Sequence, residues 1–587
     1  MSKAASKLGH LLAELKRRKV YRVAAVYVVV GLVVVEAANN FLPALNVPDW
    51  TITLVVVLTI LGLPIALVLA WALELTPEGI RVTPPAEKAE GAAAGEEEAT
   101  AAGDQAPIGR PTTEPHEPAP RRGPSDDRPC VVVLPFANLS GDPENEFFSD
   151  GVTEDIMARL AGIRGLRVIS RTTAMRYKGT DLSVPQIAAE LGAQAAVEGT
   201  VRRSAERVRV TAQLIDAERD EHLWAETYDR VLEDVFAVQS DVAENIARAL
   251  DTELTPGERE RLQRKPTENL AAYDLCLKGM RTTGSLDPEA LRRSERYFQE
   301  AIALDPGYAR AYAGLAMTLV FKGYIADVAP AELFPQLRAM ANEALRLDPG
   351  LGEAYTALAC LAFWYEWDWA RVERELQRAL EINPDDMFAL LFRGFSLLVA
   401  ERFAEAETFF REALRRDPHH AMGNVDLAQL RRCTGRPDEG VTILDGVLRR
   451  EPRNYDARLW RGICQIDSGN LEQAASDFDL AISMVGRLPV TIMFRGLVHA
   501  FSGEKEPAQR ILEELRARAK DEYVDPYYLF SLCLPIEGFD AAFTYLERML
   551  EVRSRFVTYL RVTPRYRELR SDPRFMRVLR KVWPDDF

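Results

Sequence analysis

The chain has 587 residues, of which 47% are hydrophobic and 27% charged, a composition typical of folded multidomain proteins and not of disordered or collagen-like chains. Its 88 acidic and 73 basic residues give a net charge of −15, so its field repels phosphate backbones and we expect no nucleic acid partner. The six cysteines form no C-x-x-C pair, which excludes a zinc knuckle, a thioredoxin motif and a disulfide scaffold.

Two apolar stretches near the amino terminus predict a membrane hairpin. Residues 51–73 carry no charge and would measure about 35 Å as a helix, enough to span a bilayer. Residues 21–42 are interrupted only by Glu36 and an Asn pair near the far end. A signal peptide is the alternative, but no small-residue cleavage site follows a short apolar core. We therefore expect a two-helix transmembrane hairpin within 21–75, with the lipid bilayer as a partner.

Charge around the hairpin predicts its orientation. Residues 1–20 form a basic amphipathic segment that ends in the run KRRK at 16–19, whereas the connection 39–50 has no Lys or Arg. Basic flanks stay in the cytoplasm, and two spans return the chain to the side on which it started. The sequence thus predicts a protein of the bacterial inner membrane with its soluble domains in the cytoplasm.

A linker and an α/β domain follow. Residues 76–128 are dominated by Pro, Ala and Glu and cannot bury enough surface to fold, so we expect a disordered linker. Residues 129–262 alternate strand-like and helix-like segments in the order β-α-β-α-β-β-β-α, which predicts a small α/β domain. Within it, Val208, Val210, Ala212 and Leu214 alternate with polar residues, which indicates a sheet with one covered face.

The α/β segment resembles a known bacterial domain. The resemblance rests on VVVLPFANLSGDPENEFFSDGVTEDI, RTTAMRYKG, AAELGAQAAVEGTVRR and VRVTAQLIDAERDEHLWAETYDR, and it covers nearly all of 129–254. These are similar to the TolB amino-terminal-like (FlgO-like) domain, which bacterial membrane-anchored proteins carry beside cyclase or DNA-binding modules. The resemblance implies the same α/β fold and assigns no activity to the domain itself.

One loop of this domain invites a functional interpretation. Free N–H groups at a helix start can hold an anion, and the candidate ligand loop has this position in the sequence. Helix capping by its own carboxylates is the stronger interpretation, because they already occupy the positive end of the helix. The candidate residues are Ser149, Asp150, Gly151, Thr153 and Glu154.

Prolines recur with a fixed period after residue 267. Pro384, Pro418 and Pro452 are 34 residues apart, and small residues stand at fixed offsets from them. This is the period of tetratricopeptide (TPR) repeats, which are helix pairs that stack into a curved array with a concave groove. We expect an all-α TPR solenoid over 267–500, and degenerate repeats with a carboxyl-terminal cap over 501–587.

The first helix of each repeat predicts a mostly apolar groove. It lacks the Lys and Asn clamp that would hold a peptide carboxylate, so capture of a free carboxyl terminus is not favoured. Either a protein partner binds there, or the cap or the α/β domain fills the groove; the sequence leaves both open. The candidate groove residues are Met317, Phe321, Phe363, Trp364, Phe388, Leu391, Phe395 and Arg432.

Catalytic and metal-binding motifs are missing from the sequence, which contains no Walker A, G-x-G-x-x-G, H-E-x-x-H or G-x-S-x-G pattern. We therefore expect no cofactor, no metal and no enzymatic activity. The sequence predicts a non-enzymatic, inner-membrane-anchored scaffold that binds protein partners through its TPR groove and has a possible role in signalling. The alternative is a small-molecule or nucleotide sensor, in which the α/β domain controls how the repeats dock. The oligomeric state is not predicted.

Overall fold

The computed structural model describes residues 59, 73–76, 79–82, 128–142, 145–204, 206–283, 287–325 and 328–584. The chain divides into two compact units, Met1–Arg121 and Arg122–Phe587. In the first, β1 (Leu73–Thr76) pairs antiparallel with β2 (Gly79–Val82). This ladder lies where the sequence places the boundary between hairpin and linker. The segment 1–20 and most of 21–75 and 76–128 lie outside the described residues.

Membrane spans were searched for over the described residues only. None of the helices there combines the length and the apolar character that a bilayer crossing requires.

The second unit begins with the predicted α/β layer. One six-stranded sheet has the order β5-β3-β6-β7-β8, with β4 also paired to β6. The strands β5, β3, β4 and β6 run parallel to their neighbours, and β6, β7 and β8 form an antiparallel meander. The elements are β3 (Cys130–Val133), β4 (Ala137–Asn138), α4 (Glu146–Ala161), β5 (Arg167–Val168), α5 (Arg171–Ala174), α6 (Val184–Leu191), β6 (Ala195–Arg203), β7 (Arg207–Asp216), β8 (Glu221–Val231) and α7 (Val235–Ala249).

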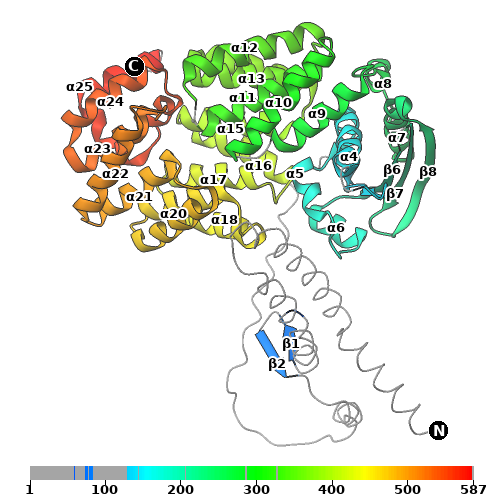
Figure 1. The fold of residues 1–587 in the computed structure, drawn as a ribbon, viewed down its shortest axis with the longest axis horizontal. Helices are drawn as coiled ribbons and strands as arrows, with labels where there is room; N and C mark the ends of the chain where they lie inside the picture. The colour runs from blue at the N-terminus through cyan, green and yellow to red at the C-terminus, as the bar shows by residue number, and fades with distance from the viewer. Residues whose placement is uncertain are drawn as a thin grey trace, which may run out of the picture. The chain divides into compact units, whose positions relative to one another are not determined.

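The sheet has one covered and one polar face, as the alternation in β7 predicts. Val208, Val210, Ala212 and Leu214 are fully buried. On the other face Arg207 and Arg209 both pair with Asp229 of β8. Figure 1 shows that α4 lies between this sheet and the helical repeats.

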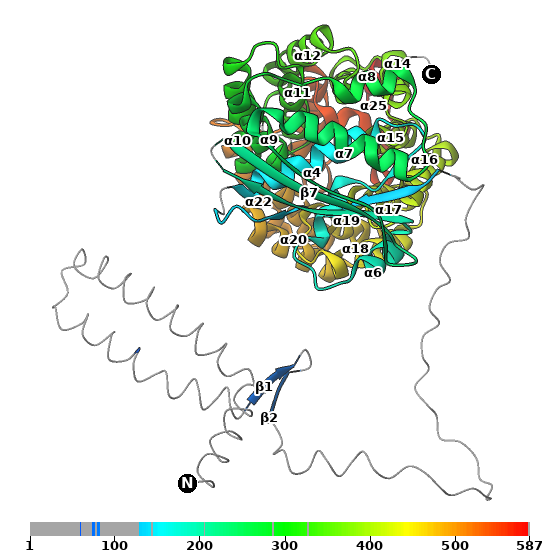
Figure 2. The ribbon, with the colours of Figure 1, turned by 90° about the vertical axis from the view of Figure 1, so that its right-hand side faces the viewer.

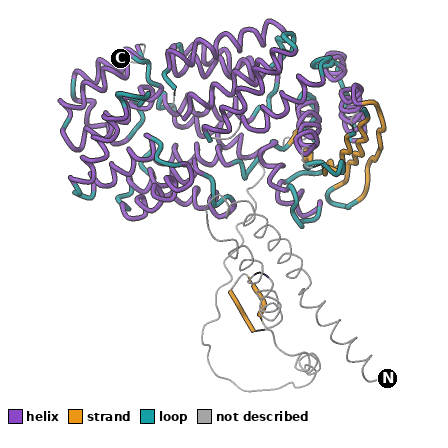
Figure 3. Tube along the Cα trace, in the orientation of Figure 1, coloured by secondary structure: helices purple, strands orange, loops and turns teal. Residues whose placement is uncertain are grey.

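Helices make up the rest of the unit, as Figure 3 shows, and they continue in pairs well past Pro489. They are α8 (Pro256–Gln263), α9 (Leu270–Thr283), α10 (Pro288–Leu304), α11 (Ala309–Ile325), α12 (Pro330–Leu347), α13 (Gly352–Leu361), α14 (Trp369–Ile382), α15 (Met387–Val399), α16 (Phe403–Arg416), α17 (Ala421–Cys433), α18 (Pro437–Arg450), α19 (Tyr455–Asp467), α20 (Leu471–Val485), α21 (Pro489–Phe501), α22 (Lys505–Arg518), α23 (Pro526–Glu537), α24 (Phe539–Glu551) and α25 (Pro573–Val582).

Small residues allow the two helices of a repeat to cross closely. A Cβ atom on Gly394 would lie 2.6 Å from the Phe410 ring, and one on Gly462 would lie 2.7 Å from the Phe478 ring. Real Cβ contacts do not reach such distances, so glycine is required at both crossings for these phenylalanines to remain in place. The small residues that recur at fixed offsets from the prolines therefore lie where paired helices cross.

The α/β layer and the repeats share one core at their junction. Tyr273 and Leu277 of α9 belong to the buried cluster of the α/β layer. The Tyr273 ring packs edge-on against Phe236 and Phe148, at centroid distances of 4.7 and 6.5 Å. Figure 2 shows α4, α7 and α9 side by side above the sheet. The first repeat helix thus completes the fold of the preceding domain.

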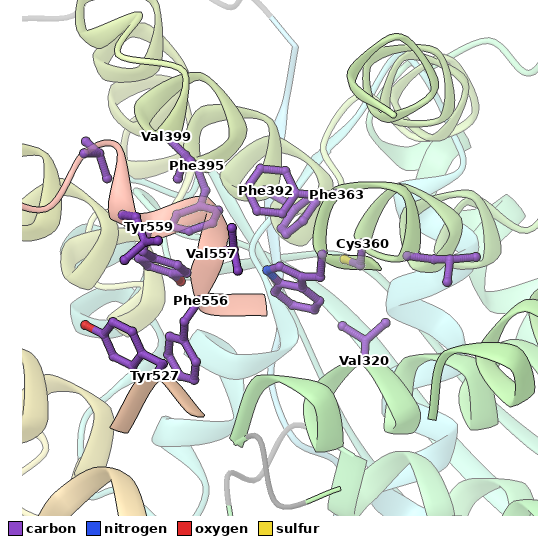
Figure 4. Packing of buried hydrophobic residues seen from close by; sticks show 14 of the residues in the cluster. Val320, Cys360, Phe363, Phe392, Phe395, Val399, Tyr527, Phe556, Val557 and Tyr559 are labelled. Atoms are coloured by element: carbon purple, nitrogen blue, oxygen red, sulfur yellow. The ribbon is translucent and has the colours of Figure 1, made fainter. Parts of the chain in front are cut away.

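The carboxyl-terminal segment turns back into the concave side of the array after α24. Its 3₁₀ helix η7 (Arg555–Leu560) brings Tyr559 against Phe395, with ring centroids 5.3 Å apart. Figure 4 shows the two side chains next to each other. Farther on, Trp583 stacks on Trp369 at 3.6 Å, with ring planes 8° apart. The segment is therefore packed inside the array and does not end it as an outer cap alone.

Candidate protein-binding site

Five of the eight predicted groove residues are buried, and the chain's own carboxyl-terminal segment contacts two of them, Trp364 and Phe395. Arg555 of η7 lies over the Trp364 ring at 6.0 Å, and Arg432 pairs with Asp467 at 2.6 Å. Of the two possibilities that the sequence leaves open, self-occlusion therefore describes this part of the groove. The exposed fractions are Phe363 0%, Trp364 2%, Leu391 1%, Phe395 6% and Arg432 4%.

The other three groove residues remain accessible. Met317, Phe321 and Phe388 are half-buried, and the rings of Phe321 and Phe388 lie 5.6 Å apart. All three line a cleft of about 860 Å³. We call it the junction cleft, because α4, β5 and α5 of the α/β layer line it together with the repeat helices α9, α11, α13, α15, α17, α19 and α20.

Methionines supply much of the apolar surface of the junction cleft. Six of the twelve methionines in the chain line it, one from each of six helices. Methionine is unbranched and polarisable, and it adapts its shape to different apolar partners. The cleft surface is thus suited to the varied apolar side chains of a polypeptide rather than to one rigid ligand. These residues are Met157, Met280, Met317, Met387, Met422 and Met484.

The polar groups of the junction cleft are mainly acidic. Seven carboxylates line it against three arginines, and two of these arginines are engaged, Arg171 with Glu154 and Arg310 with Asp155. The carboxylates are Glu154, Asp287, Glu353, Asp385, Asp386, Glu451 and Asp456.

Three of these carboxylates form no ion pair among the described residues. Within the described part of the chain, no ion pair joins Glu353, Asp386 or Asp456 to a cation at 4.0 Å or less. Asp386 caps α15 by accepting from the Ala389 N–H at 3.0 Å. Burial raises the pKa of Asp386 and that of Asp456 to about 6. Both groups would therefore be favoured in their charged form by a cation entering the cleft.

Polar contacts between the two walls hold the junction cleft in shape. Asp385 takes two arginines, Arg128 at 2.8 Å and Arg416 at 2.6 Å. Arg176 pairs with Glu451 at 2.8 Å, and Asp417 accepts from Ser170 at 2.6 Å. Charge-assisted contacts of this kind fix orientation as well as distance.

A buried polar network ties α4 to the first repeats. The Asp155 carboxylate, which is 3% exposed, accepts from Gln239 at 3.0 Å and from the Tyr273 hydroxyl and the Arg310 guanidinium. These three hydrogen bonds offset the free-energy cost of burying the Asp155 carboxylate.

The structure differs from the sequence prediction at the candidate ligand loop. Helix α4 begins at Glu146, so the residues from Asp150 to Glu154 lie within it and their N–H groups are used in helix bonds. Gly151 is required there, because a Cβ would lie 2.3 Å from Leu277. Ser149 is fully buried, and Thr153 accepts from the Phe136 N–H at 3.0 Å. The loop is thus a packing surface without a free anion cradle.

The charged residues of that loop are already paired. Lys178 contacts Asp150, and the Arg171 guanidinium lies 2.7 Å from Glu154. Burial still raises the pKa of the Glu154 carboxyl, with Arg171 acting in the opposite direction. Glu154 also lines the junction cleft, so it is the one loop residue that keeps a place in a candidate site.

Comparison with known proteins confirms the repeats. A tetratricopeptide repeat family model matches residues 361–421 and 425–487. Two solved structures match the chain at low similarity. The human IFIT1 dimer with PPP-AAAA is 14% identical with a TM-score of 0.39, over 59% of this chain and 78% of that one. A tetratricopeptide repeat protein from Parabacteroides merdae is 17% identical with a TM-score of 0.33, over 46% and 99%.

A curated relative corrects one sequence prediction. Putative adenylate cyclase 3 of Rhizobium meliloti (strain 1021) is 42% identical over 190 residues, which are 32% of this chain and 32% of the relative. The chain thus spans about a third of the length of that relative. The prediction that the chain is not an enzyme rested on missing motifs, and this match to a protein named as an enzyme overturns it. The expectation that nucleic acid is not a partner rests on charge and stays a prediction.

Proposed function

We propose that the chain is a protein-interaction scaffold whose partner binds in the junction cleft. The observation that carries this proposal is the pairing of six methionines with unpaired carboxylates along one cleft of about 860 Å³. The TPR repeats support it, since stacked helix pairs present extended concave surfaces to other proteins.

The chemistry of the cleft points to a basic amphipathic segment as the partner. Apolar side chains on one face of a helix would contact the methionines, and Lys or Arg on the other face would reach Glu353, Asp386 and Asp456. The cleft would recognise such a helix through adaptable apolar contacts, which give moderate specificity. Long-range attraction between opposite charges would speed association.

Fluorescence anisotropy with a labelled synthetic peptide tests this proposal. The probe is an 18-residue helix with Leu on one face and Lys on the other, and the matched peptide has Glu in place of every Lys. The full chain should bind the Lys peptide and not the Glu peptide. Binding should weaken as salt is raised, because the partly exposed charges are screened.

Two double variants separate the cleft from the rest of the acidic surface. Glu353→Gln with Asp386→Asn should weaken the Lys peptide about tenfold, on the basis of roughly 1.4 kcal/mol for two charge contacts. Glu472→Gln with Glu513→Gln removes the same charge from exposed positions on α20 and α22. An equal loss of peptide affinity in both double variants would show that binding depends on net charge alone. It would refute the proposal that the peptide binds in the junction cleft.

A second candidate function is adenylate cyclase activity, and the match to the Rhizobium relative favours it. The measurement is formation of cyclic AMP from ATP by the purified full chain, with Mg²⁺ and with Mn²⁺ in separate reactions. Product that scales with protein concentration supports this candidate. A rate equal to that of the heat-denatured protein excludes it under these conditions.

We also propose that residues 21–75 anchor the scaffold in the bacterial inner membrane and leave the remainder in the cytoplasm. The apolar stretches and the basic run at 16–19 support this. Alkaline phosphatase fused after Arg81 should be inactive, and a fluorescent cytoplasmic reporter at the same position should be bright. The reverse pattern would overturn the orientation.

A further inference from the structure

A second, smaller cavity lies where the carboxyl-terminal segment meets the repeats. It has a volume of about 70 Å³ and lies between α19, α21 and α23 of the repeats and η7. Eight aromatic side chains line it, among them Tyr324, Trp460 and Phe494. Tyr455 and Asp456 line both this cavity and the junction cleft. The inference below concerns the arginines of this cavity only and goes beyond the proposed function.

Two arginines in the wall of this cavity have N–H groups without an acceptor. Arg555 is 8% exposed, and its Nε and Nη1 atoms have no hydrogen-bond partner. The side chain of Arg565 is 12% exposed, and its Nε and Nη1 atoms lack a partner as well. The two residues come from η7 and from the 3₁₀ helix η8 (Pro564–Ser571), so they belong to the same carboxyl-terminal segment.

The carboxylates near these arginines already accept from other donors, among them Asp525, which accepts from the Ser554 hydroxyl at 2.7 Å and from the Tyr527 N–H at 2.9 Å. Asp456 accepts from the Tyr324 hydroxyl at 3.2 Å. Asp467 pairs with Arg432 at 2.6 Å and lies 3.7 Å from a different nitrogen of Arg565, Nη2. The rings of Phe556 and Tyr324 lie 4.0 and 4.9 Å from the Arg555 guanidinium. These rings stabilise the positive charge of the guanidinium. They do not supply a hydrogen-bond acceptor for its Nε atom.

Leaving these groups unpaired is costly. A buried donor without an acceptor costs about 1–3 kcal/mol, and more when it belongs to a charged group. Buried guanidinium groups are normally paired with an anion or fully hydrogen-bonded. Four unpartnered guanidinium nitrogens beside the cavity therefore indicate that something with acceptor atoms occupies it.

We propose that this cavity binds a small organic carboxylate between Arg555 and Arg565. The planar fork of a guanidinium matches the two oxygens of a carboxylate. The volume leaves room for about three to five non-hydrogen atoms, by comparison with the space that a single water needs. The aromatic walls accommodate the short apolar tail of such a carboxylate. Phosphate has no apolar side and would need polar partners all round.

The bound carboxylate would link η7 to η8 within the carboxyl-terminal segment. Arg555 lies on η7, which covers the predicted groove residues Trp364 and Phe395. A ligand that binds only the folded arrangement stabilises it in proportion to the logarithm of its concentration. Carboxylate binding would thus hold η7 in place.

Thermal unfolding of the full chain tests the site, with hydrogen exchange of η7 as a second readout. The probes are propionate, its neutral isostere propionamide, and inorganic phosphate, each at up to 100 mM with NaCl added to equal ionic strength. Propionate should raise the unfolding midpoint and slow exchange in η7, and propionamide should do neither. Equal effects of propionate and propionamide, or no effect of propionate, would overturn the proposal and leave water as the occupant. An equal effect of phosphate would overturn the assignment to carboxylates.

Substitutions then locate the binding site. Arg565→Gln should weaken propionate at least tenfold, while Arg548→Gln, which changes an arginine that is 61% exposed, should not. If Arg565→Gln does not fold, the probe series on the unaltered chain still decides the question. Binding of the Lys peptide in the junction cleft is measured in a separate assay. A failure of the carboxylate site can therefore be distinguished from a failure of the proposed partner site.

Discussion

Replacing Trp583 by alanine removes the side chain that fastens the carboxyl-terminal segment to the repeats. Trp583 is 4% exposed, and it stacks on Trp369 at 3.6 Å. The Arg561 guanidinium covers it at 4.8 Å, and the neighbouring Val582 carbonyl accepts from Trp369 Nε1 at 2.8 Å. Truncation of a buried tryptophan costs about 3–5 kcal/mol, through lost burial and the cavity that remains.

Hydrogen exchange of the folded chain is the suitable assay, because repeat arrays do not always unfold in one step. If the segment opens as a unit, a loss of about 3–5 kcal/mol corresponds to roughly 10²- to 10⁴-fold faster exchange in η7 and α25. Phe501→Ala changes an aromatic residue that is 44% exposed and serves as the control, with an expected effect below about 1 kcal/mol. Exchange in η7 that is no faster in Trp583→Ala than in the control would refute the idea that this stack holds the segment.

Three further outcomes follow from the structure. Asp155→Ala removes the buried partner of Arg310, whose side chain is 19% exposed, so urea denaturation should show a loss of about 3–5 kcal/mol; a loss below 1 kcal/mol would mean that the network does not couple α4 to the repeats. Gly151→Ala should cost about 1–3 kcal/mol in the same assay because its Cβ meets Leu277, whereas Gly257→Ala has open space and should be close to neutral. The pKa of Asp386 is raised by burial from 3.8 to about 6, so its destabilising effect grows as pH rises between these values and is full above pH 6. Asp386→Asn keeps a good helix cap and should therefore be about 2 kcal/mol more stable than the unaltered chain at pH 7 and equal to it at pH 4, and a constant difference across this range would contradict the pKa assignment.

Local patterns made the repeats and the sheet predictable. The spacing of the prolines reflects the length of one helix pair, and the glycines at 394 and 462 reflect contacts within such a pair. The residues in these contacts lie close together in the sequence. The alternation in β7 likewise reports a face that a neighbouring strand and helix cover. Such signals survive in the sequence because both partners of each contact lie close together in it.

Contacts between distant segments account for what sequence reasoning missed. Trp369 and Val582 are 213 residues apart, so no local pattern revealed that the carboxyl terminus returns to the groove. The start of α4 was placed too late because Glu146 and Phe147 follow a turn-rich run. Phe148 joins the helix because it is buried against Tyr273 of α9, a residue in another predicted domain. The junction cleft was missed for the same reason, since its methionines come from helices spread over much of the chain.

The central claim is that a protein partner binds in the junction cleft, and NMR of methionine methyl groups tests it most directly. The chain is labelled with ¹³C at the methionine methyls, and each signal is assigned by single Met→Leu substitutions. On addition of the Lys peptide, the signals of the six cleft methionines should shift together. Met340, Met493, Met549 and Met576 do not line the cleft, and their signals should stay in place. Shifts confined to these four, or saturable binding that moves none of the six cleft signals, would contradict the account.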